Sequence, residues 1–92
     1  MKPSPVTDYV ITERLEMERR GLKEETVRLV LSAAEQRMEV RPGRIVLQAR
    51  LPLGAPARAY LVRVFVDVDR RPPGVVTVYG ASRISKYWEE GS

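Results

Sequence analysis

Residues 60–68 read YLVRVFVDV, and this alternating stretch decides the fold. Valine occupies every second position from Val62 to Val68. The other face of this strand holds Leu61, before the first valine, and Arg63, Phe65 and Asp67 between the valines. Because successive side chains of a strand point to opposite faces, the pattern predicts a β-strand with one apolar face and one mixed face. The apolar face must be covered by other elements of the chain.

The same period of two recurs on both sides of this strand. It is present over residues 36–41, 44–51 and 75–79. Residues 41–44 read RPGR, with Pro and Gly at the two central positions that a type II turn favours. Because short turns join consecutive strands in antiparallel pairs, we expect a four-stranded antiparallel sheet over residues 36–80.

Before the sheet, the apolar period changes to that of a helix. A first helix is expected over about residues 12–20 and should end at Gly21, which tolerates a left-handed backbone. The apolar face of a second helix holds Val27, Val30, Leu31 and Ala34. We therefore predict one α+β domain over residues 1–92. It has an N-terminal helical hairpin (7–35) packed on the sheet, and a tail with a short C-terminal helix (81–92).

The composition excludes several kinds of chemistry. The 92 residues include no Cys and no His, which removes a thiol nucleophile, Cys-ligated zinc and the usual general base near neutral pH. No cofactor or metal site is predicted. No apolar run approaches the ~18 residues of a membrane-spanning helix, and no secretory signal opens the sequence. We therefore expect a cytoplasmic protein that does not bind membranes.

The net charge of +4 is unevenly distributed along the chain. Residues 1–35 carry six basic and seven acidic residues, whereas residues 36–92 carry ten basic and five acidic ones. A basic sheet and tail favour a polyanionic partner, above all RNA. The alternative is that the Arg-rich composition has no role in binding.

The expected open face of the sheet supplies candidate RNA contacts. In this pattern Met38 and Val40 face the helices, together with the apolar residues of the other strands. The candidate nucleic-acid-binding residues are Arg37, Arg41, Arg44, Arg50, Arg63 and Arg83. Arg44 and Arg63 are expected on facing strands, where they could hold one phosphate between them. The alternative for Arg63 is a cross-strand ion pair with Glu39 or another acid.

Several short motifs together resemble a known family. They are Arg20-Gly21-Leu22, Glu24-Glu25-Thr26-Val27, Gly43-Arg44-Ile45-Val46, Tyr60-Leu61-Val62-Arg63-Val64, Val76-Thr77-Val78-Tyr79, Ser82-Arg83-Ile84 and Lys86-Tyr87-Trp88. This set resembles a bacterial family of domains of unknown function related to the RelE/ParE-like toxins, whose fold is a helical hairpin on an antiparallel sheet. The chain departs from the family pattern at Thr12 and Glu16, where members usually carry His and Arg.

The resemblance implies a toxin with a neutralising antitoxin. Similarity to the RelE branch implies a metal-independent endoribonuclease that cleaves mRNA, in association with the ribosome; similarity to the ParE branch implies a protein target. Cleavage by a 2′-hydroxyl needs a base, cations for the phosphate and an acid for the leaving oxygen. The catalytic candidates are Arg63, Tyr79 and Lys86. The alternative for Tyr79 is a partly buried ring with a satisfied hydroxyl, and for Tyr87 and Trp88 it is packing of the tail over the sheet.

A second hypothesis comes from another functional class. The protein could be a non-catalytic interaction module that docks an antitoxin segment or a second copy of itself as a homodimer. The docking surface would be an exposed strand edge or the apolar side chains Val46, Leu61 and Phe65 on the basic face.

Overall fold

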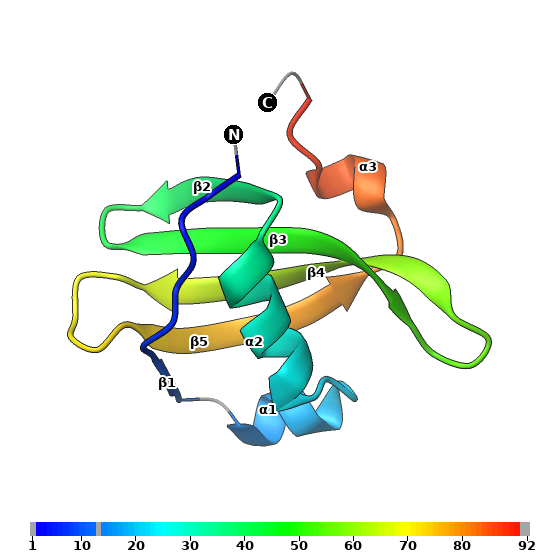
Figure 1. Ribbon diagram of the computed structural model, residues 1–92, viewed down its shortest axis with the longest axis horizontal. Coiled ribbons are helices and arrows are strands. Elements are labelled where there is room, and N and C mark those ends of the chain that lie inside the picture. Colours follow the sequence, from blue (N-terminus) through cyan, green and yellow to red (C-terminus); the bar gives the residue numbers. More distant parts are fainter. Residues whose placement is uncertain (1, 13, 91–92) are drawn as a thin grey trace.

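The computed structural model describes residues 2–12 and 14–90, without the side chains of Arg14 and Leu15 (Figure 1). In chain order the elements are β1 (Val10–Ile11), α1 (Arg14–Arg19), α2 (Glu24–Ala33), β2 (Gln36–Arg41), β3 (Arg44–Leu53), β4 (Arg58–Asp67), β5 (Gly74–Ala81) and α3 (Ile84–Tyr87). In this part of the chain, no helix is long and apolar enough to cross a membrane.

The sheet has five strands in the order β1-β5-β4-β3-β2 and is mixed. Strands β2 to β5 pair antiparallel, whereas β1 lies parallel to β5. The backbone N–H of Val10 donates to the Pro73 carbonyl at 2.9 Å, and that of Thr12 donates to Val75 at 3.0 Å. The prediction of a four-stranded antiparallel sheet is therefore wrong. A two-residue strand is too short to display a period, so the sequence pattern did not reveal β1.

The predicted helical hairpin is also wrong. α1 has only six residues and contacts β5, while the ten-residue α2 contacts β3 and β4 across one face of the sheet (Figure 1). Gly21, with φ of +71°, separates the two helices as expected. The guanidinium of Arg20 donates to the Val78 carbonyl at 2.8 Å, so the chain after α1 caps part of the β5 edge that β1 leaves open.

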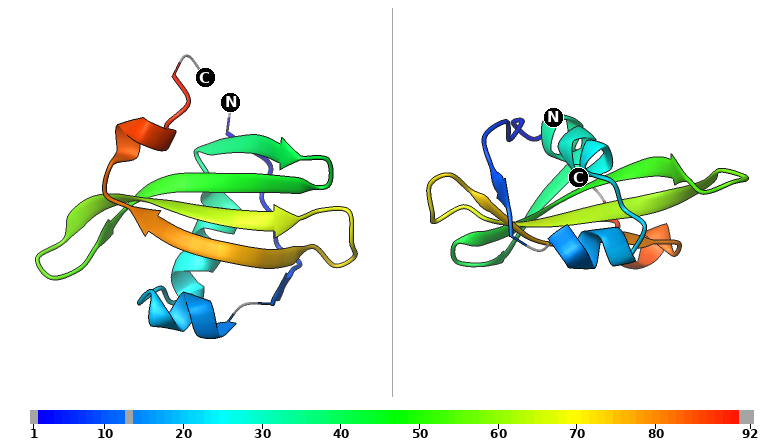
Figure 2. Two further views of the ribbon diagram at one scale, coloured as in Figure 1. Left: turned by 180° about the vertical axis from the view of Figure 1, so that it is seen from behind. Right: turned by 90° about the horizontal axis from the view of Figure 1, so that it is seen from below.

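The core lies between α2 and one face of the sheet. Val27, Val30 and Leu31 of α2 are fully buried, and they belong to one apolar cluster with Leu47 of β3 and Val64 of β4. Burial of each such side chain stabilises the fold by about 1.5 to 3 kcal/mol. α3 lies on the other side of the sheet from α2 (Figure 2). We call that other side the open face.

In β2, the side chains point to the opposite faces of the sheet from those predicted. Arg37 of β2 pairs with Leu47, which faces α2, whereas Met38 pairs with Val46 on the open face. The register then shifts between Glu39 and Arg41. The predicted placement of Met38 toward the helices, and of Arg37 on the open face, is therefore wrong. β2 is an edge strand with mostly exposed or half-buried side chains, so its alternation carries little information about the core.

Candidate nucleic-acid interface

Four polar side chains form a row across the open face, one from each antiparallel strand. The strand registers pair Gln36 with Gln48, Gln48 with Arg63, and Arg63 with Tyr79. Their side chains are joined by hydrogen bonds in the same order. Gln48 donates to Gln36 at 2.8 Å, and Arg63 donates from Nε to Gln48 at 2.9 Å and from Nη1 to the Tyr79 hydroxyl at 2.6 Å. The sheet register therefore creates one continuous polar network.

Arg63 lies at the centre of this network. Its guanidinium carbon lies 4.5 Å from the centroid of the Tyr87 ring, 5.3 Å from that of Phe65 and 5.7 Å from that of Tyr79. Phe65 and Tyr79 stack with their centroids 5.9 Å apart. We call Gln48, Arg63, Phe65, Tyr79 and Tyr87 the Arg63 cluster. Glu39 pairs instead with Ile45 on the α2 side, so the predicted alternative of an ion pair with Arg63 is wrong.

The charge of Arg63 is held without an acid from the described part of the chain. Its guanidinium donates to the amide oxygen of Gln48 and to the hydroxyl of Tyr79, both neutral groups. A guanidinium has five N–H donors, so donors remain for a ligand. The Arg63 guanidinium is therefore held in one orientation, and the groups that hold it do not neutralise its positive charge.

A shallow cavity of about 330 Å³, wide open to solvent, adjoins the cluster where β5 runs into α3. It is lined by Tyr79, Arg83, Lys86 and Tyr87, and by residues 80–82, which have small side chains or none. Arg83 and Lys86 are exposed at its rim. The structure thus brings together the three residues singled out as catalytic candidates, because Tyr79 binds Arg63 on one side and lines the cavity with Lys86 on the other. Tyr79 is half-buried with its hydroxyl bonded, which also fits the structural alternative.

Arg44, by contrast, does not reach this site. Its guanidinium makes a two-point contact with Asp67, from Nε at 2.6 Å and from Nη2 at 3.1 Å. This hydrogen bonding holds the pKa of the Asp67 carboxyl below its ordinary value. In the β3–β4 register, Arg44 pairs with Asp67 and lies four positions from the residue opposite Arg63, a separation of roughly 13 Å. The predicted phosphate clamp of Arg44 and Arg63 is therefore wrong.

Arg50 is paired with an acid in the same way. It donates to the Glu35 carboxylate from Nη2 at 2.7 Å and from Nε at 3.1 Å. These hydrogen bonds hold the pKa of Glu35 at about 2, against an ordinary value of 4.5. The Arg50 guanidinium also lies 4.1 Å from the centroid of the Trp88 ring. Its charge is partly neutralised, and its flat face is used for stacking.

This pair predicts a defined acid sensitivity. Because folding lowers the pKa of Glu35, its stabilisation is present above the ordinary pKa and is lost as pH falls from about 4.5 toward 2. The contribution should be on the order of 1 kcal/mol, since the Arg50 side chain is 51% exposed. In urea titrations, Glu35→Gln should be less stable than wild type at pH 7, and this difference should shrink at low pH. A constant difference at all pH values would contradict the assignment.

The remaining predicted contacts lie elsewhere or are inaccessible. Arg41 is exposed at the β2–β3 turn, where its side chain donates to the Pro42 carbonyl at 3.4 Å. Val46 and Leu61 are buried, so the proposed docking surface loses both, while Phe65 stays half-buried. Of the six predicted arginines, Arg63 belongs to the cluster and Arg83 lines the cavity, while Arg50 lies against Trp88.

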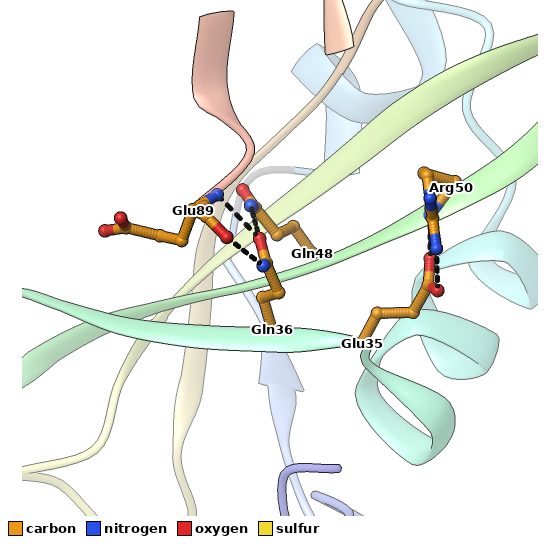
Figure 3. A network of polar contacts seen from close by, with 5 residues as sticks. All are labelled: Glu35, Gln36, Gln48, Arg50 and Glu89. Atoms are coloured by element: carbon orange, nitrogen blue, oxygen red, sulfur yellow. Dashed lines mark hydrogen bonds and ion pairs between the residues drawn. The ribbon is translucent and has the colours of Figure 1, made fainter. Parts of the chain in front are cut away.

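Sequence reasoning missed the role of the two glutamines. Gln48 is fully buried and Gln36 is 7% exposed. Gln36 binds the backbone of Glu89 (Figure 3), and Gln48 donates to the carbonyl of Tyr87, the last residue of α3. A glutamine in the middle of the apolar strand at residues 45–49 was the available signal, because buried polar residues are informative. The sequence alone did not show what they bind.

No family model, curated protein or solved structure matches this chain. The resemblance to RelE/ParE-like toxins stays a prediction. Among residues 2–12 and 14–90, no three acidic side chains gather as ligands for a metal ion.

Proposed function

We propose that this protein binds single-stranded RNA at the Arg63 cluster and the adjoining cavity. The observation that carries the proposal is the unneutralised Arg63 guanidinium, fixed by Gln48 and Tyr79 among three aromatic rings. Exposed Arg83 and Lys86 at the rim of the cavity suit the phosphates of the backbone. Aromatic and guanidinium planes suit unstacked bases.

The site suits a single strand better than a duplex. Its polar row crosses four strands, a span of about 15 Å, which only a few nucleotides can cover. Bases held inside a duplex cannot stack on such rings, whereas unpaired bases can be splayed onto them. Phosphate contacts from Arg83 and Lys86 would make the affinity fall as salt rises.

Strand cleavage is a second function that one observation favours. The Tyr79 oxygen accepts from Arg63 at 2.6 Å, so its own hydrogen is directed to another acceptor, and Lys86 lines the same cavity. In such a cleavage the 2′-oxygen bonds to phosphorus as the bond to the 5′-oxygen breaks. The proton of the 2′-hydroxyl passes to solvent water, and the Tyr79 hydroxyl or the Lys86 ammonium gives a proton to the leaving 5′-oxygen. On this proposal the protein is a toxin-family ribonuclease with an antitoxin partner, as its sequence motifs suggest.

The test is a titration of labelled single-stranded RNA with the purified full chain. Fluorescence anisotropy at several salt concentrations should show binding that weakens with salt, and a duplex of the same sequence should bind less tightly. Gel analysis of the same mixtures in EDTA should show whether strands are cut. Absence of salt-dependent binding to the single strand would exclude the proposed function.

A further inference from the structure

The last residue of α3, Tyr87, and the chain after it are held on the open face through their backbone. The side-chain amide of Gln36 donates to the Glu89 carbonyl at 2.8 Å, and its oxygen accepts from the Glu89 N–H at 3.0 Å (Figure 3). Gln48 donates to the Tyr87 carbonyl at 3.1 Å. One side-chain amide thus pairs with both polar groups of a single residue, as amides pair in the edge contacts of nucleic-acid recognition.

The rings of this segment lie on guanidinium groups. Tyr87 lies against Arg63 at 4.5 Å, and Trp88 lies against Arg50 at 4.1 Å, each measured from the guanidinium carbon to the ring centroid. We call residues 87–89 the tail. The tail therefore presents two consecutive flat rings to two arginines and one planar amide edge to a buried glutamine.

These are the two kinds of contact that unpaired bases make with proteins. Bases stack on aromatic rings and on arginine planes, and their edges pair with side-chain amides such as those of Gln and Asn. A face that accepts Tyr87, Trp88 and the Glu89 backbone in this way has the groups needed to accept two bases. With the tail in place, Gln48 is fully buried and Gln36 is 7% exposed.

We infer that the tail occupies the base-binding part of the RNA site, and that unpaired bases bind there by displacing it. The inference rests on the proposed function and adds the residues that contact bases: Gln36, Gln48, Arg50 and Arg63. Phosphates would first meet exposed Arg83 and Lys86. The bases would then stack on Arg63 and Arg50 in place of Tyr87 and Trp88, while Phe65 and Tyr79 stay in the site. Only molecules whose tail is released can bind bases in this way. The apparent affinity for RNA therefore equals the affinity of the released state multiplied by the small fraction of molecules in that state.

A proline at position 89 tests the inference through the tail backbone alone. Glu89→Pro removes the N–H that donates to Gln36 and leaves every sheet residue in place. Trp88 has φ of −74° and ψ of 129°, a conformation that the residue before a proline adopts readily. Glu89→Ala is the matched control, because it removes the same carboxylate and keeps the N–H.

We expect Glu89→Pro to bind single-stranded RNA about fivefold more tightly than Glu89→Ala, the change expected when one net hydrogen bond no longer holds the tail. In the wild type, RNA should shift the emission of Trp88, the only tryptophan, to longer wavelength as its ring leaves Arg50. Equal or weaker binding by Glu89→Pro, or an unchanged emission in the RNA complex, would overturn the displacement and leave RNA binding standing. No binding by wild type or either variant would overturn both proposals.

Discussion

Arg63→Ala is expected to weaken binding of single-stranded RNA about 30-fold or more. The substitution removes the one cation at the centre of the cluster, and hydrogen bonds to charged groups contribute about 1.5 to 3 kcal/mol each. It also removes the plane on which Tyr87 now lies and on which a base would stack. The measurement is the dissociation constant by fluorescence anisotropy at fixed salt.

Two further variants separate geometry from charge. Arg63→Lys keeps the positive charge but lacks the planar fork that reaches Gln48 and Tyr79 together, so it should recover only a small part of the affinity. Arg71→Ala removes the same charge from the loop before β5, at the other end of that strand from α3, and should change the affinity less than threefold. Equal losses for Arg63→Ala and Arg71→Ala would mean that binding depends on net charge and not on the cluster.

The alternating valines of residues 60–68 were sufficient to predict the centre of the sheet. Val62, Val64 and Val66 are all fully buried, as the period of two requires. The RPGR turn was also predictable from local sequence. Glycine adopts the φ of +84° found at Gly43 without strain. The strand and the turn were therefore predicted correctly, because each has a strong local sequence pattern.

The errors arose where a local pattern cannot report a distant contact. β1 depends on pairing between Val10–Ile11 and the start of β5, more than sixty residues later. The count of basic residues likewise gave no sign that Asp67 and Glu35 would take up the charges of Arg44 and Arg50. Arg63 and Tyr79 were candidates from the sequence. The contacts that join Arg63 to Gln48 and to Tyr79 depend on the register of β3, β4 and β5. The candidate site therefore depends more on which strands pair, and in which register, than on any short sequence motif.

Gln48→Leu is expected to produce the largest loss of stability among polar substitutions in the described part of the chain. Gln48 is fully buried and bonds to Gln36, Arg63 and the Tyr87 carbonyl. Leucine has a similar size but leaves these groups without their partner, and an unsatisfied buried polar group costs about 1 to 3 kcal/mol. A total loss of about 3 kcal/mol should follow, measured as the free energy of unfolding in urea.

A double-mutant cycle distinguishes a lost network from a simple packing defect. Arg63→Met removes the guanidinium that would otherwise lack its Gln48 acceptor, and replacing both partners of a buried pair with apolar groups is often nearly neutral. The double variant Gln48→Leu/Arg63→Met should therefore be at least about 1 kcal/mol more stable than the sum of the single changes implies. Additive effects would mean that the two side chains contribute separately, and that Gln48 does not hold the Arg63 guanidinium in place. Because RNA binding is proposed to depend on that guanidinium, strong coupling in the cycle would predict that Gln48→Leu also weakens RNA binding.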